Sequence, residues 1–135
     1  MPGLKVTSAE MVARARARIS EISAGEATGL VGDPEVVFVD LRDLRERQRL
    51  GFIPGAFHCP RGMLEFWVDP ESRYFKDVFG QQKRFVFYCA SGWRSALSVA
   101  VLDDMGFPAE HIREGFTGWV EQGGPVAFPE PRAAR

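Results

Sequence analysis

A cysteine followed at short intervals by glycine, arginine and serine is the part of this 135-residue chain best suited to chemistry. The run from Arg84 to Tyr88 is rich in valine and phenylalanine, which predicts a buried strand that stops at Cys89. An apolar pattern of helical period begins at Ala96, so Cys89 should lie on a loop that opens a helix. Unpaired backbone N–H groups and the positive end of the helix dipole favour a thiolate there. The sequence therefore indicates a nucleophilic cysteine beside an anion-binding loop.

The residues after Cys89 each have a use in such a loop. Gly92 lets the chain curl and brings backbone amides close to a ligand. Arg94 adds a permanent charge with a fork of donors that suits oxyanions, and Ser95 can cap the helix or hydrogen-bond the sulfur. A cysteine at the end of a strand is often just a small buried hydrophobic residue. The combined Cys-x-x-Gly-x-Arg-Ser pattern favours a reactive site instead, and such a site requires a sulfur open to solvent with the loop amides directed at it.

Composition points to one ordinary globular domain. The chain is 45% hydrophobic and 26% charged, with a net charge of −1, which gives no reason to expect nucleic acid or a membrane surface as a partner. We find no apolar run of membrane-spanning length and no signal-peptide core, so we expect a cytoplasmic location. Two distant cysteines and two histidines do not suggest a disulfide, a metal site or a cofactor.

Helical patterns alternate with short apolar runs along the chain, which predicts an α/β fold with a largely parallel central sheet and helices on both faces. A helix over residues 7–19 should begin at a capping box formed by Thr7 and Glu10. The apolar run Val36–Asp40 predicts another buried strand, and the charged run 43–49 an exposed helix in which Glu46 can pair with Arg42 or Arg49. We divide the chain into an N-terminal helical extension (1–18), the main domain (19–127) and a flexible tail (128–135).

Four motifs, in order along the chain, resemble those of the single-domain form of the rhodanese-like (thiosulfate sulfurtransferase) family. They are Asp40-Leu-Arg42, Gly51-Phe-Ile-Pro-Gly-Ala-Phe-His-Cys-Pro60, Cys89-Ala-Ser-Gly-Trp-Arg-Ser95, and Glu114-Gly115 with Trp119 and Gly124-Pro-Val126. The resemblance covers Ile22 to Val126 and implies a rhodanese-like fold, to which the first helix is an addition. Phe52, Cys59 and Phe116 depart from the usual pattern. None lies in the loop, so we expect them to affect substrate preference more than the chemistry, and we place Cys59 in the core.

The resemblance implies transfer of a sulfane sulfur through a persulfide on Cys89. The donor would be thiosulfate or a related persulfide, and the acceptor a thiol, cyanide or a sulfur-carrier protein. The loop amides would solvate the sulfur, Arg94 would orient the anionic donor or hold the loop, and Trp93 would shield the persulfide, contact substrate or simply cover the loop. The implied site comprises Cys89 as the nucleophile, Ala90, Ser91, Gly92, Trp93, Arg94 and Ser95 as the loop, and Asp40, Arg42 and His58 as supporting residues.

Two other classes of function stay open. Cysteine-dependent phosphatases and arsenate reductases also place a cysteine and an arginine around an oxyanion, but the phosphatases of this fold have a Cys-x5-Arg loop. The Cys-x4-Arg spacing here encloses less space and suits a single sulfur atom better than a phosphate. The other class is a non-catalytic or sulfur-relay protein-binding module. Retention of Cys89 favours chemistry over the non-catalytic version.

Overall fold

The structure, a computed structural model, describes residues 3–130 and is built on a five-stranded sheet in the order β1-β5-β4-β2-β3. All neighbouring strands run parallel, as expected from the alternation of helices and strands. The strands are β1 (Ser20–Ile22), β2 (Val36–Asp40), β3 (Phe57–His58), β4 (Arg84–Tyr88) and β5 (Glu110–Ile112). The α-helices are α1 (Ser8–Arg16), α2 (Ala24–Thr28), α3 (Leu44–Leu50), α4 (Leu64–Val68), α5 (Trp93–Met105) and α6 (Gly115–Glu121). Two 3₁₀ turns, η1 (Arg61–Met63) and η2 (Asp77–Gly80), complete the set.

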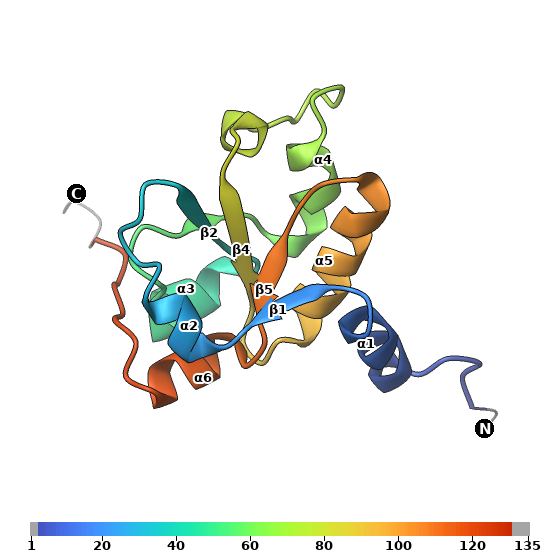
Figure 1. Cartoon of the computed structure of the whole chain (residues 1–135), viewed down its shortest axis with the longest axis horizontal. Coiled ribbons are helices and arrows are strands. Elements are labelled where there is room, and N and C mark those ends of the chain that lie inside the picture. The colour runs from blue at the N-terminus through green and yellow to red at the C-terminus, as the bar shows by residue number, and fades with distance from the viewer. Residues whose placement is uncertain (1–2, 131–135) are drawn as a thin grey trace.

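Helices cover both faces of the sheet, which confirms the predicted fold class (Figure 1). The alternation of side chains along β4 shows why two apolar layers form: Phe85 and Phe87 belong to one core cluster, and Val86 and Tyr88 to the other. The first cluster includes residues of α4 and α5, and the second includes residues of α2 and α6. A central strand buried on both sides explains the continuous apolar run in the sequence.

The helix ends follow from local chemistry, with two corrections. Thr7 and Glu10 form the predicted capping box at the start of α1, but the helix ends at Arg16, so Ile19 lies outside it. Helix α5 begins at Trp93, with Gly92 as its N-cap, which is two residues earlier than the predicted start at Ser95. Ser95 is therefore inside the first turn, where its side chain is free to bond the sulfur.

Helix α1 packs on α5 through the small residues Ala15, Ala96 and Ala100, so the predicted extension lies against the helix that follows the loop. Residues 131–135 of the predicted tail lie outside the described part of the chain. None of the helices within residues 3–130 combines the length and apolar character needed to cross a membrane.

Candidate active site

Cys89 lies directly after the carboxyl end of β4, where the parallel strands of the sheet end and α5 begins (Figure 1). The backbone N–H of Gly92 donates to its Sγ at 3.2 Å, and the N–H of Ser95 donates at 3.4 Å. The thiol in turn lies 3.5 Å from the hydroxyl of Ser95. These N–H groups belong to the N-cap and first turn of a 13-residue helix, where no intrahelical partner exists for them. The arrangement favours negative charge on the sulfur.

Two expectations about the sulfur need correction. Cys89 is only 1% exposed, whereas we expected a sulfur open to solvent. We also expected the backbone amides of Ala90 to Arg94 to solvate the sulfur. Within this range, the amide of Gly92 is the one that donates to Sγ. The loop folds tightly because the carboxyl end of a strand and the start of a helix are joined by few residues. In this conformation Cys89 therefore offers almost no surface to solvent.

The first turn of α6 holds the loop from the other side. The N–H groups of Phe116 and Thr117 donate to the carbonyls of Cys89 and Ala90 at 2.8 and 3.0 Å. A side chain on Gly115 would collide with the backbone of Ala90, so glycine is required at this close approach. Phe116 was expected to lie away from the loop, but its backbone contacts Cys89 directly. The departure from the family pattern at this position therefore touches the site itself.

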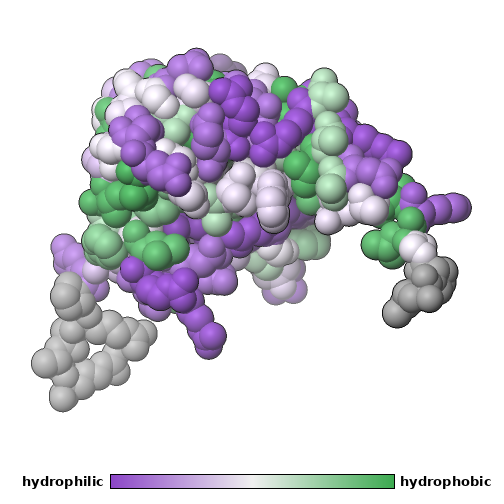
Figure 2. All heavy atoms as spheres, turned by 90° about the horizontal axis from the view of Figure 1, so that it is seen from below, coloured by the Kyte–Doolittle hydropathy of each residue, from purple (hydrophilic) through white to green (hydrophobic). Residues whose placement is uncertain are grey.

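The remaining loop residues differ in exposure. Ser91 is exposed, and Trp93 is 64% exposed. Trp93 lines a cavity of about 400 Å³ between the first turn of α5 and α1, together with Arg94 and residues of α1 that include Arg16 and Val12. Its ring is therefore largely open to solvent at the edge of this cavity. Seen from the end of the molecule that carries the loop, the surface mixes polar, weakly polar and apolar side chains (Figure 2).

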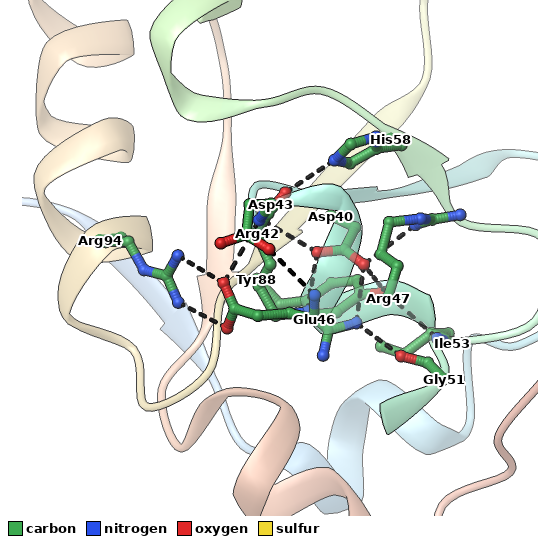
Figure 3. A network of polar contacts seen from close by, with 10 residues as sticks. All are labelled: Asp40, Arg42, Asp43, Glu46, Arg47, Gly51, Ile53, His58, Tyr88 and Arg94. Carbon is green, nitrogen blue, oxygen red and sulfur yellow. Dashed lines mark hydrogen bonds and ion pairs between the residues drawn. The ribbon is translucent and has the colours of Figure 1, made fainter. Parts of the chain in front are cut away.

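Arg94 is held outside the loop by Glu46 of α3. Its two terminal nitrogens donate to the two carboxylate oxygens at 2.9 and 3.0 Å (Figure 3). These hydrogen bonds are the main reason why the pKa of Glu46 lies below its ordinary value. We had expected Glu46 to pair with Arg42 or Arg49 within its own segment, and that expectation was wrong. A contact between residues so distant in sequence leaves no local pattern to predict it.

Asp40 and Arg42 form a buried ion pair behind the site. Arg42 donates to both carboxylate oxygens, at 3.0 and 2.8 Å, and to the carbonyl of Gly51 at 2.7 Å. Tyr88 donates to Asp40 at 3.0 Å (Figure 3). Burial would raise the pKa of Asp40, but the hydrogen bonds and charge of Arg42 hold it below its ordinary value. The pair ties the end of β2 to the end of β4.

Two aromatic rings complete the surroundings of Arg42. Its guanidinium lies 4.3 Å from the ring centroid of Phe116 and 5.5 Å from that of Tyr88. These rings face a guanidinium whose third nitrogen has no hydrogen-bond partner. His58 donates through Nε2 to the backbone carbonyl of Arg42 at 2.7 Å, and we keep it as a structural residue.

Two polar residues that the sequence did not single out for the site, His111 and Glu21, extend it inward from Ser95. Ser95 Oγ lies 2.7 Å from Nδ1 of His111, and Nε2 of His111 lies 2.7 Å from a carboxylate oxygen of Glu21. Glu21 is on β1 and His111 on β5, and they face each other because these strands pair in register. A histidine directly before a hydrophobic residue of a short strand gives no sequence signal of this kind. Only the strand order brings it behind Cys89.

The fold and the site define a parallel α/β domain with one cysteine at the start of a helix. The profile of the rhodanese-like domain family matches residues 23–122. The chain belongs to this family.

Known proteins agree with this assignment. The Bacillus subtilis protein named "Putative sulfurtransferase YtwF" is 31% identical over 102 residues, which cover 75% of this chain and 90% of that protein. A structure from Rhodopseudomonas palustris, RPA3614, titled a protein of unknown function and "Possible Tyrosine Phosphatase", is 46% identical with a TM-score of 0.89 and covers 94% of this chain and 99% of its own. A thiosulfate sulfurtransferase from Pseudomonas aeruginosa shares the fold at 22% identity and a TM-score of 0.67, over 82% of this chain and 20% of that one.

Proposed function

We propose that this chain is a sulfurtransferase in which Cys89 carries a sulfane sulfur as a persulfide. The Cys89 thiolate attacks the outer sulfur of thiosulfate or a related donor. One S–S bond forms while the S–S bond of the donor breaks, and sulfite leaves with the bonding electrons. A thiol, cyanide or a sulfur-carrier protein then attacks the outer sulfur and releases Cys89 as a thiolate, in a ping-pong sequence.

The observation that carries this proposal is the pair of backbone N–H groups directed at Sγ, from Gly92 and Ser95. Such donors stabilise the thiolate as nucleophile and as leaving group. The names of the sulfurtransferase relatives point in the same direction. Because Cys89 is 1% exposed, transfer also requires that the loop around Gly92 opens to admit the donor.

Intact-mass measurement tests the proposal. Incubation of the reduced protein with thiosulfate should add the mass of one sulfur atom, and added cyanide should remove it. Cys89→Ser should show no gain, whereas Cys59→Ala, which changes the buried second cysteine, should load as the parent does. Absence of the adduct with both thiosulfate and a small persulfide donor would overturn the proposal.

Cysteine-dependent hydrolysis of phosphate esters is the second candidate, because the Rhodopseudomonas palustris structure carries "Possible Tyrosine Phosphatase" in its title. The Cys-x4-Arg spacing disfavours it, and so does the bidentate contact of Arg94 with Glu46, since that contact occupies the donors that a bound phosphate would need. Hydrolysis of an aryl phosphate without sulfur loading would select this candidate. Failure of both reactions would favour a protein-binding module.

A further inference from the structure

A continuous chain of polar contacts leads from the sulfur into the interior and out again at α1. The thiol of Cys89 lies 3.5 Å from Ser95 Oγ, and that oxygen lies 2.7 Å from His111 Nδ1. The other ring nitrogen lies 2.7 Å from Glu21 Oε2. Arg16 donates to the same carboxylate oxygen at 3.1 Å. Ser95 and His111 are both fully buried, so water does not compete for these contacts.

The partners fix the direction of each hydrogen bond. Glu21 can only accept when ionised, so neutral His111 carries its proton on Nε2 and presents Nδ1 as an acceptor. The hydroxyl of Ser95 then donates to Nδ1, and its oxygen accepts from the thiol of Cys89. In this state the sulfur is a thiol whose own proton is directed at Ser95, while the backbone N–H groups of Gly92 and Ser95 donate to the sulfur.

We infer that Ser95, His111 and Glu21 form a proton relay that takes the proton of the Cys89 thiol and so positions a thiolate for the proposed sulfur transfer. The thiol proton passes to Ser95 Oγ while the hydroxyl proton of Ser95 passes to His111 Nδ1. The S–H bond breaks, an N–H bond forms, and the electron pair stays on sulfur. The hydrogen bonds then reverse, so that His111 donates to Ser95 and Ser95 donates to the thiolate.

The charges around His111 suit a group that is neutral at rest and holds a proton temporarily. Burial lowers the pKa of His111, while its hydrogen bond with Glu21 acts in the opposite direction. The charges of Arg16 from α1 and of Arg113, directly after β5, also disfavour the imidazolium. Ser95 of α5 also contacts the imidazole, and Cys89 of the loop contacts Ser95 in turn. A new negative charge on Cys89 balances the imidazolium, as Glu21 does on the far side.

The relay also gives α1 a role in the site. Arg16 donates to Glu21, and it also donates to the backbone carbonyl of Arg113, two residues after His111, at 3.4 Å. It thus fixes the carboxylate that determines which nitrogen of His111 carries the proton. The helix that precedes the family match at residues 23–122 therefore supports the last member of the relay.

The pH dependence of Cys89 alkylation tests the relay, because a purely structural histidine would not change it. His111→Gln removes the imidazole that takes the proton. We therefore expect the midpoint of the rate profile to rise by about one pH unit, which makes alkylation roughly tenfold slower at neutral pH. Glu21→Gln, which removes the charge that stabilises the imidazolium, should move it in the same direction. Glu35→Gln is the matched control, since Glu35 pairs with Lys83 and is 74% exposed.

An unchanged midpoint in folded His111→Gln would overturn the relay. If that variant fails to fold, as judged by circular dichroism, Glu21→Gln decides by the same criterion. The reciprocal measurement uses NMR of the histidine rings, of which the chain has two. The ring of His111 should titrate at lower pH in Cys89→Ser than in the parent protein, because the thiolate no longer stabilises its charge; equal titration in the two proteins would contradict the relay.

The relay rests on the proposed function for its purpose, but the two can fail separately. Alkylation reports the ionisation of Cys89 without any sulfur donor. A shifted midpoint in the variants together with no sulfur adduct in the parent protein would keep the relay and remove sulfur transfer. Normal sulfur loading of the parent protein with no shift of the alkylation midpoint in the variants would keep sulfur transfer and remove the relay.

Discussion

Arg94 is the one charged residue of the loop motif 89–95, yet its guanidinium is directed at Glu46. The side chain of Arg94 is 42% exposed and that of Glu46 is 20% exposed, so the pair is partly screened by water. Its main effect on the site is to neutralise a positive charge beside the loop. The attraction of an anionic donor then depends on how firmly this ion pair is closed.

Substitutions of Glu46 and of Arg94 should change the KM for thiosulfate in opposite directions. Glu46→Gln frees the charge of Arg94 and keeps an acceptor for the helix cap, so KM should fall by about two- to fivefold. Arg94→Gln should raise KM by a similar factor. Both effects should shrink at high salt. A shift of KM in the same direction in both variants would show that the pair acts only by holding the structure.

At the scale of elements, the site depends on how closely three segments approach at the start of α5. Gly92 has a φ of 92°, and a side chain there would collide with the carbonyl of Arg113. The same residue donates the shorter backbone hydrogen bond to Sγ. The tight packing of the loop against the residues after β5 therefore sets the position of the donor.

Gly92→Ala should damage both stability and reactivity. The left-handed backbone and the collision together should lower the free energy of unfolding by about 2–4 kcal/mol, and displacement of the amide should slow sulfur loading roughly a hundredfold. Gly106→Ala is the matched control. Gly106 has a φ of 82° but open space around it, so this variant should lose only about 1 kcal/mol. Sulfur loading should be unchanged in it, and equal loading in both variants would count against the loop geometry as the cause.

The elements that the sequence predicted well are those whose signal is local. The apolar runs gave β2 and β4 at their observed bounds, because strands buried on both faces are apolar throughout. The start of α5 was misplaced because Trp93 and Arg94 carry no capping signal, whereas Ser95 looks like a cap. The cap is instead a glycine in the left-handed conformation.

The parts of the site that escaped prediction all depend on strand order. Glu21 and His111 meet because β1, the first strand, pairs with β5, the last one. The contact of Glu46 with Arg94 likewise joins residues 48 positions apart. Local periodicity defines each element but does not say which elements become neighbours. The position of Cys89 between a strand and a helix was predictable because the loop motif is contiguous in sequence.

Across the whole molecule, several groups that can ionise are buried in one charge state. Asp40 is buried as a carboxylate and is paired with Arg42. Tyr88 is buried beside it, and burial followed by the charge of Asp40 raises the pKa of the phenol. Cys59 is fully buried among apolar side chains. The folded state therefore favours a charged Asp40 and uncharged Tyr88 and Cys59, so its stability should fall at both extremes of pH.

Cys59 should make the protein lose stability in mildly alkaline solution. Burial raises the pKa of its thiol to about 12, whereas an unfolded thiol ionises near pH 8.5. The stabilisation is complete below the unfolded value and is lost as pH rises toward the folded one, at about 1.4 kcal/mol for each pH unit. Between pH 8.5 and 10, the free energy of unfolding from urea titrations should fall more steeply in the parent protein than in Cys59→Ala. Both proteins keep Cys89 and Tyr88, so those groups cancel in the comparison. Parallel profiles would mean that Cys59 reaches water in the folded state, contrary to its position in the core.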